Sequence, residues 1–249
     1  MKLQNTSYQG SKSLLRARSA LFFIAMTLAT VIVGPTMLLA APLPFRYRYG
    51  LAQIWVTFVL WAVKAICGLD YRVVGAENIP SGNGIVLCKH QSAWETIALQ
   101  KIFPPQVFLL KRELLWLPIW GWAMATLEPI AINRKSKKQA LRTLLKHGAD
   151  RLRKGLWVVI FPEGTRVAPG QQRKFNAGGG MLSHATGYPV IPVAHNAGEF
   201  WARYGFLKYP GTIELRIGPA IPSEGRRAAD INRAAEDWIR TQMNEISAA

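Results

Sequence analysis

Cysteine and acidic residues are both scarce in this chain of 249 residues. Its two cysteines, Cys67 and Cys88, provide neither a disulfide framework nor a zinc cluster, and we expect both thiols to be buried. Fourteen Asp and Glu accompany 31 Lys and Arg, which gives a formal charge of +17. Such an excess is typical of proteins that meet polyanions: nucleic acid, an anionic membrane surface, phosphorylated substrates or an acidic carrier protein.

Several common motifs are also missing. The patterns GxSxG, GxGxxG and GxxxxGK do not occur, which argues against a serine hydrolase with a nucleophile elbow, a dinucleotide-binding enzyme and a P-loop enzyme. No reader motif of nucleic-acid-binding proteins is present, and the part of the chain without acidic residues is apolar. We therefore expect no nucleic-acid partner, although a basic nucleic-acid-binding protein is one alternative to an enzyme.

The first 69 residues contain no Asp or Glu, and seven basic residues lie before, between and within two apolar runs. Residues 20–41 carry no charge and are long enough to enter the hydrocarbon core of a membrane, although Gly34-Pro35 interrupts them. Residues 51–66 are apolar nearly all round, which suits a helix at the headgroup level or against the rest of the protein. Three polar residues form a narrow stripe on this second run: Gln53, Thr57 and Lys64.

We predict that residues 1–69 form a membrane-associated helical hairpin and that residues 70–249 form a separate domain. Basic residues before and between the runs favour the cytoplasmic side, so we expect a re-entrant hairpin, with the active site on the cytoplasmic face of the inner membrane. A bilayer-spanning arrangement is one alternative. Another is a cleaved signal peptide ending near Ala40-Ala41, although its apolar region would be longer than usual.

After Asp70, short β-branched runs alternate with longer helical patterns, which is typical of an α/β domain. We predict a mixed sheet of about seven strands flanked by helices. The predicted strands are residues 71–74, 85–89, 107–110, 130–133, 156–161, 190–194 and 212–217. The predicted helices are residues 93–101, 137–153, 177–186 and 230–246, the last with an apolar stripe at helical spacing.

His90 and Glu95 form the first candidate pair for chemistry. The apolar run 84–89 predicts a buried strand, and Ser92 is a good N-cap for the following helix, so His90 lies in the strand-to-helix turn. With Glu95 in the first helical turn, the two side chains can converge. A neutral imidazole oriented by a carboxylate removes protons from hydroxyl groups. A structural histidine beside a surface glutamate is the alternative.

A second motif, Phe161-Pro-Glu-Gly-Thr-Arg166, follows another predicted strand. Proline ends strand pairing, and Gly164 lets a substrate approach the backbone. Arg166 can hold a phosphate with two hydrogen bonds, and Thr165 can add another. An ion pair between Glu163 and Arg166 is the alternative interpretation.

Four blocks in this chain, covering about residues 71–220, resemble the glycerolipid acyltransferase family, specifically the 1-acylglycerol-3-phosphate acyltransferases. Each block alone is weak evidence, but four in the family's order are specific. The family has Asp where this chain has Glu95, a carboxylate one methylene longer that can still orient an imidazole. The blocks are Lys89-His90-Gln-Ser-Ala-Trp-Glu95, Leu110-Lys-Arg-Glu-Leu114 leading to Ile130-Ala-Ile-Asn133-Arg134, Phe161 to Arg166, and Val190-Ile-Pro-Val193.

The resemblance implies a reaction and a set of roles. His90 is the general base for the sn-2 hydroxyl of lysophosphatidic acid, which attacks a thioester, and Glu95 orients His90. Glu163, Gly164, Thr165 and Arg166 form the acceptor site. Lys111 and Arg134 are further anion-site candidates or, alternatively, solvated surface charges. The implied product is phosphatidic acid for phospholipid synthesis.

No metal and no resident cofactor are expected, since acyl-CoA or acyl carrier protein enters as a co-substrate. Nine Lys and Arg between residues 134 and 154 form either a dock for the donor or anionic lipid, or a solvated helix face. Three Trp between residues 116 and 122 pack in the core or form a lipid entry rim. His147, His184 and His195 receive no role. Another lyso-lipid acceptor, such as a lyso-aminolipid, is an alternative, whereas the intact His90 and Glu95 argue against a non-catalytic lipid scaffold.

Overall fold

The computed structural model describes residues 8–248 and contains a seven-stranded sheet in the order β1-β7-β6-β2-β5-β3-β4. Neighbouring strands are parallel except for β6 and β7, which are antiparallel. The predicted mixed sheet is therefore confirmed. The strands are β1 (Leu69–Val74), β2 (Ile85–Cys88), β3 (Gln106–Lys111), β4 (Ile130–Ile132), β5 (Trp157–Ile160), β6 (Val190–His195) and β7 (Gly211–Ile217).

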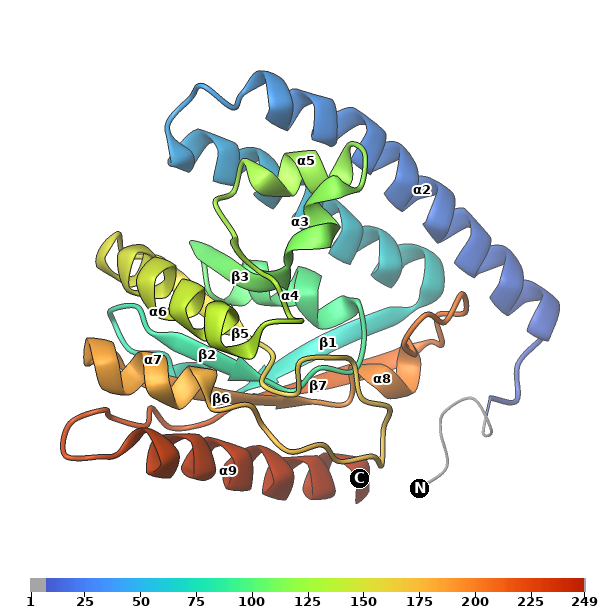
Figure 1. Ribbon diagram of the computed structural model, residues 1–249. Coiled ribbons are helices and arrows are strands. Elements are labelled where there is room, and N and C mark those ends of the chain that lie inside the picture. The colour runs from blue at the N-terminus through green and yellow to red at the C-terminus, as the bar shows by residue number, and fades with distance from the viewer. Residues whose placement is uncertain (1–7, 249) are drawn as a thin grey trace.

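Helices cover both faces of the sheet (Figure 1). In β2, Val86 and Cys88 pack toward α3 and α4, whereas Ile85 and Leu87 pack toward α6, α7 and α9, because successive strand residues point to opposite faces. The helices of the domain are α4 (Trp94–Ile102), α5 (Trp120–Ala125), α6 (Lys137–Arg153), α7 (Gly178–Thr186), α8 (Ala197–Phe200) and α9 (Ala228–Ala248), with short 3-10 turns η1 (Ala76–Asn78) and η2 (Arg112–Trp116).

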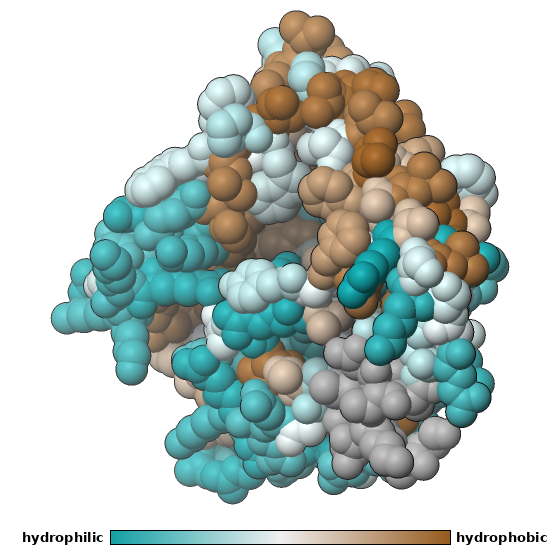
Figure 2. All heavy atoms as spheres, turned by 90° about the vertical axis from the view of Figure 1, so that its right-hand side faces the viewer, coloured by the Kyte–Doolittle hydropathy of each residue, from teal (hydrophilic) through white to brown (hydrophobic). Residues whose placement is uncertain are grey.

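Two long helices, α2 (Lys12–Leu39) and α3 (Phe45–Cys67), precede the sheet, and both are long and apolar enough to cross a membrane. Much of their apolar surface is exposed: Leu28, Ile32 and Trp61 are each more than half exposed. Figure 2 shows apolar atoms gathered over the upper part of the molecule and hydrophilic atoms over the lower part. An exposed apolar band of this kind favours contact with lipid.

The expected interruption at Gly34-Pro35 is not observed, because α2 continues through Pro35 to Leu39. The proline lies near the end of the helix, where its missing N–H removes a single backbone hydrogen bond. Gly34 instead permits close packing on the domain, since a Cβ atom there would lie 2.5 Å from Cγ2 of Ile119.

The polar stripe on α3 runs along the edge of the domain: Gln53 is half-buried against it, whereas Thr57 and Lys64 are exposed. Gln53 Nε2 donates to the Gln100 carbonyl at 2.9 Å, and Lys64 Nζ lies 2.7 Å from an Asp70 carboxylate oxygen. On α2, Phe22 is fully buried and packs edge-on against Trp201 at 5.4 Å between ring centroids. The hairpin is therefore packed against the α/β domain along both helices.

Candidate active site

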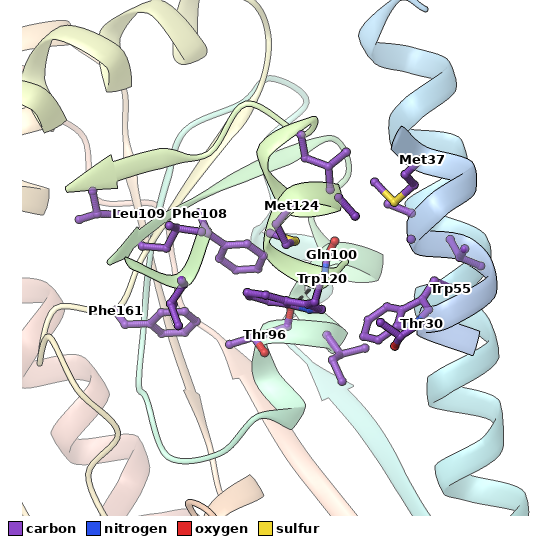
Figure 3. Close-up of a pocket in the computed structure, with 18 of the residues that line it drawn as sticks. Thr30, Met37, Trp55, Thr96, Gln100, Phe108, Leu109, Trp120, Met124 and Phe161 are labelled. Carbon is purple, nitrogen blue, oxygen red and sulfur yellow. Dashed lines mark hydrogen bonds between the residues drawn. The ribbon is translucent and has the colours of Figure 1, made fainter. Parts of the chain in front are cut away.

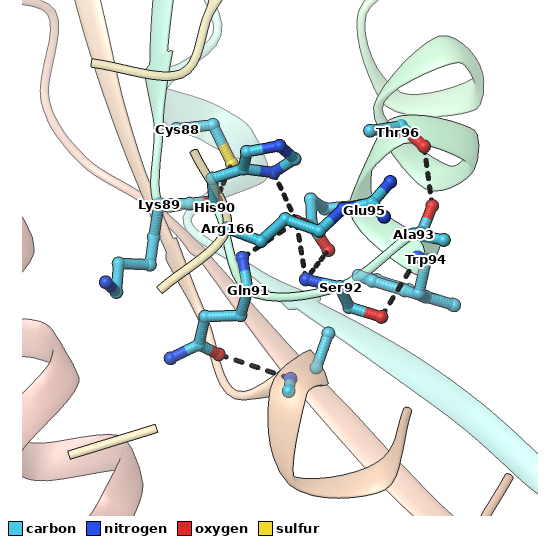
Figure 4. Close-up of polar contacts among 12 residues, drawn as sticks. Cys88, Lys89, His90, Gln91, Ser92, Ala93, Trp94, Glu95, Thr96 and Arg166 are labelled. Atoms are coloured by element: carbon cyan, nitrogen blue, oxygen red, sulfur yellow. Dashed lines mark hydrogen bonds and ion pairs between the residues drawn. The ribbon is translucent and has the colours of Figure 1, made fainter. Parts of the chain in front are cut away.

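The two sequence motifs follow adjacent strands. β2 pairs in parallel with β5, so the segment after Cys88 and the segment after Ile160 leave the same edge of the sheet side by side. Strand alternation continues into the first segment: His90 points toward the α4 side, and Lys89 and Gln91 point the other way (Figure 4). The His90 ring stacks on Phe161 with 4.0 Å between ring centroids.

The Glu95 carboxylate holds His90 and the turn that carries it. Glu95 is fully buried, and its Oε1 lies 2.8 Å from Nδ1 of His90. The backbone N–H groups of Gln91 and Ser92 donate to the same oxygen at 2.9 and 2.8 Å. Because an ionised carboxylate only accepts hydrogen bonds, Nδ1 carries the proton, and Nε2 of His90 is left with a free lone pair.

The Glu95 carboxylate also holds the turn before α4. Ser92 Oγ accepts the Trp94 N–H at 3.1 Å, and Glu95 Oε1 accepts the Ser92 N–H at 2.8 Å. The N-cap residue of α4 is Ala93 rather than the predicted Ser92. One carboxylate therefore holds both this turn and the His90 ring. Burial alone would raise the pKa of Glu95, but His195, His90 and the Ser92 N–H together lower it.

Glu163 lies beneath the site and does not face its cavity. Its side chain is 1% exposed, pairs with the buried ammonium group of Lys89, and accepts the backbone N–H of His90 at 2.9 Å through Oε2. Burial raises the pKa of Glu163, and the Lys89 charge opposes that rise. This placement differs from the expected contact with the acceptor. Among the described residues Glu163 pairs with Lys89, so the alternative of an ion pair with Arg166 is wrong.

Two arginines flank His90 on the other side. Arg166 and Arg134 line the same cavity as His90, and Arg166 Nε is buried without a hydrogen-bond partner among the described residues. Arg134 Nη1 donates to the Gly164 carbonyl at 2.5 Å, and Gly164 has a φ of 71°, in the left-handed region that favours glycine. The backbone of this turn therefore holds Arg134, and the same turn contains Arg166.

The remaining predicted residues lie farther from the cavity. Thr165 is half-buried in the turn, and Lys111 is exposed at the end of β3, with Nζ 3.9 Å from a Glu113 carboxylate oxygen. Within the described chain, neither of them lines the cavity that holds His90. The structure thus brings together His90, Glu95, Arg134 and Arg166 and leaves Lys111 outside.

The cavity has a volume of about 180 Å³ and runs from His90 to the space between α2 and α3 (Figure 3). Aromatic and aliphatic side chains form most of its wall, and Phe108, Trp120 and Met124 point into it. The hairpin supplies Thr30, Val33, Gly34, Met37, Ala52 and Trp55. An apolar cavity that ends at a base and two arginines suits an amphiphilic anion.

His195 is a residue of the site that sequence reasoning missed. It is fully buried, its Nδ1 accepts the Ala197 N–H at 3.2 Å, and its Nε2 donates to the Lys89 carbonyl at 2.8 Å. The same Nε2 lies 3.9 Å from Glu95 Oε2. Burial lowers the pKa of His195, and the Glu95 charge opposes that fall. The register could have revealed it: Cys88 pairs with Val193, which places His195 alongside His90 two residues further on.

An imidazole with one nitrogen fixed by a buried carboxylate and the other facing an apolar, arginine-flanked cavity defines a general-base enzyme for amphiphilic anions. Known proteins support a narrower class. A family model described as Acyltransferase matches residues 70–196. The 1-acyl-sn-glycerol-3-phosphate acyltransferase of Pseudomonas aeruginosa is 47% identical over 235 residues, covering 92% of this chain and 91% of its own.

Two proteins that are less similar in sequence are also named as acyltransferases. The 1-acyl-sn-glycerol-3-phosphate acyltransferase of Saccharomyces cerevisiae is 32% identical over 206 residues, covering 79% of this chain and 66% of its own. The crystal structure of the 1-acyl-sn-glycerophosphate (LPA) acyltransferase from Thermotoga maritima has the same fold, with a TM-score of 0.73 at 22% identity, and the match covers 94% of this chain and 96% of that one. The chain belongs to the acyltransferase family, and the family predicted from its four blocks is confirmed.

Proposed function

We propose that this protein is a membrane-bound O-acyltransferase that moves an acyl chain from a thioester to the sn-2 hydroxyl of lysophosphatidic acid, giving phosphatidic acid for phospholipid synthesis. The observation that carries the proposal is the His90–Glu95 pair, 2.8 Å apart, at the end of an apolar cavity flanked by Arg134 and Arg166. The printed names of the Pseudomonas and yeast relatives support the same acceptor.

The proposed reaction uses the free lone pair on Nε2 of His90. Its Nε2 takes the proton of the acceptor hydroxyl while that oxygen attacks the thioester carbonyl and forms a C–O bond. The tetrahedral intermediate then breaks the C–S bond, and the leaving thiolate receives the proton from the imidazolium. Glu95 stabilises the imidazolium through Nδ1. Glu163 acts as a positioning residue, because it holds the His90 backbone and touches no substrate.

The acceptor phosphate binds on the arginine side of His90. Arg166 supplies an unpartnered Nε and forms charge-assisted hydrogen bonds with the phosphate. Arg134 adds a second positive charge at the same wall. Thr165 remains a candidate for one further hydrogen bond, and the apolar cavity takes an acyl chain. Lys111 has no part in this arrangement.

The hairpin holds the enzyme at the membrane. We propose that the exposed apolar band of α2 and α3 enters the cytoplasmic leaflet of the inner membrane as a re-entrant hairpin, so that the cavity opens at lipid level. The exposed apolar residues and the absence of acidic residues from the first 69 positions support this arrangement.

The donor brings the acyl group, and the proposal includes no resident cofactor or metal. Acyl-CoA and acyl carrier protein are both anionic donors. The exposed lysines and arginines of α6, including Lys137, Lys138 and Arg142, are suited to either one. Assays with both thioesters would decide between them.

Acyl transfer in isolated membranes tests the proposal. Labelled thioester is supplied with lysophosphatidic acid, and His90→Ala should lower kcat about 10²–10⁴-fold, the usual contribution of a general base. His147→Ala, which removes an exposed histidine on α6, is the control and should leave the rate unchanged. Wild-type activity in His90→Ala would contradict the mechanism. A preference for a lyso-aminolipid over lysophosphatidic acid would contradict the assigned acceptor.

A further inference from the structure

A second cavity lies on the opposite side of the catalytic segment from His90. It has a volume of about 370 Å³, far more than one ordered water requires, and lies between the loop 170–173 and α9. Lys89, Gln91 and Glu163 line it at buried positions, because strand alternation turns Lys89 and Gln91 away from the apolar cavity (Figure 4).

Hydrogen-bond donors in this cavity lack protein partners. Gln91 is 1% exposed; its Oε1 accepts the Gly198 N–H at 3.2 Å, and its Nε2 has no partner among the described residues. The Lys89 ammonium group has three N–H donors, and Glu163 is its one side-chain partner in the described chain. Lys89 and Gln91 line the cavity, so their remaining N–H groups are available to an acceptor bound there.

The rest of the lining selects for negative charge. Arg173 is exposed at the rim and has no ion pair among the described residues, while Arg240 pairs with Glu236 at 2.6 Å and keeps further N–H groups. The one carboxylate in the lining, Glu163, is already occupied by Lys89 and the His90 N–H. Phe175, Ile239 and Met243 form an apolar wall beside these donors.

We propose that this cavity binds a small phosphorylated molecule. Its phosphate is held by Lys89, Gln91 and Arg173, because a phosphate oxygen accepts several charge-assisted hydrogen bonds, and its organic part lies against the apolar wall. The site is separate from the acyl-transfer site and does not depend on that assignment. The ligand nevertheless lies close to the base, since Lys89 holds Glu163 and Glu163 holds the His90 backbone.

Calorimetric titration of the full-length protein in detergent micelles at constant ionic strength tests this site. Arg166→Ala serves as the background, because it weakens anion binding beside His90. Inorganic phosphate and glycerol 3-phosphate are the probes. Similar affinities of the protein for the two indicate a site for the free anion. Tighter binding of glycerol 3-phosphate indicates that the organic part of the ester is also bound. Both probes should bind in this background.

Adding Arg173→Ala should weaken binding at least about tenfold, the effect of losing one charge-assisted hydrogen bond. Adding Lys174→Ala, which removes the neighbouring exposed charge outside the lining, should change it less than about twofold. A second variant, Asn244→Asp, places a negative charge at the rim from α9 and should also weaken binding. Absence of binding in the Arg166→Ala background, or equal weakening by the Arg173 and Lys174 substitutions, would overturn the proposal.

Discussion

The two sides of His90 differ in how completely their polar atoms are partnered. On the buried side, the Glu95 carboxylate accepts from His90 and two backbone N–H groups, and Glu163 accepts from Lys89 and the His90 N–H. On the cavity side, Arg166 Nε has no partner among the residues that the structure describes. The His90 side chain is therefore already held in place, whereas Arg166 keeps a donor for a bound anion.

Because of this difference, substitutions on the two sides should change different measured properties. Removing a partner on the buried side leaves another group unsatisfied in a low-dielectric environment, so rate and stability should fall. Removing a group on the cavity side takes away a contact that exists only with substrate bound, so KM should rise while the fold remains stable.

The largest effect is expected for Glu95→Gln. The neutral amide no longer stabilises an imidazolium, and its NH₂ group opposes the N–H donors that now point at the carboxylate, so kcat should fall about 10³-fold. Glu95→Asp keeps the charge but is one methylene too short for the present contacts with the His90 ring and the Ser92 N–H, so about a tenfold loss is expected. Steady-state kinetics of both variants check this order, and an aspartate variant as impaired as the glutamine variant would contradict it.

Lys89→Met should cost about 3–5 kcal/mol of unfolding free energy, because Glu163 then remains buried without its counter-charge. Adding Glu163→Gln should recover part of this loss, since the uncompensated charge disappears. Thermal unfolding in detergent compares these variants with Lys101→Met, which removes an exposed lysine from α4. Equal melting temperatures for Lys89→Met and Lys101→Met would show that the buried pair contributes nothing.

Arg166→Ala should raise the KM for lysophosphatidic acid about 10–100-fold, the equivalent of losing ~1.5–3 kcal/mol of charged hydrogen bonding. The KM for the thioester and the melting temperature should stay close to the wild-type values. Arg153→Ala, at an exposed position on α6, provides the matched loss of charge. Equal effects of Arg166→Ala on both KM values would argue against phosphate binding by this arginine.

His195→Gln should change the pH dependence of stability. Burial lowers the pKa of His195, so below the ordinary histidine value of about 6.5 the unfolded chain binds a proton that the folded protein does not. Wild-type stability should therefore fall as the pH drops below that value, by at most ~1.4 kcal/mol per pH unit from this group. The variant should lose this slope below about pH 6.5.

A second loss is expected at lower pH in the wild-type protein, and it should be smaller in that variant because His195 helps to lower the pKa of Glu95. The lowered pKa of Glu95 contributes stability that is present above the ordinary glutamate value and is lost as the pH falls through the folded value. Melting temperatures measured across this pH range separate the two groups. An unchanged slope just below about pH 6.5 in His195→Gln would rule out His195 as its source.

Much of the fold was predictable because its signals are local. Seven β-branched runs predicted seven strands, and the four helices predicted after residue 70 correspond to α4, α6, α7 and α9. The short helices α5 and α8 were not predicted, since six and four residues carry too little periodicity. The continuation of α2 through Pro35 depends on where the helix ends, which Gly34-Pro35 alone does not indicate.

The site was predictable only where its residues are close in sequence. His90 and Glu95 are five residues apart, and a strand-to-helix turn brings them together. The pairing of Lys89 with Glu163 and the approach of His195 to Glu95 both depend on which strands are neighbours, and the sequence does not state this order. Glu163 was expected in the acceptor site. The structure instead pairs its carboxylate with the buried ammonium group of Lys89.

Thr30, Val33, Gly34 and Met37 belong both to the exposed hairpin and to the wall of the apolar cavity. Exposed apolar residues such as Val31 and Ile32 lie on the same turns of α2. A movement of this helix that alters the outer apolar surface therefore also reshapes the space beside His90. Chimaeras that exchange α2 and α3 between relatives should accordingly change both the outer surface and the cavity.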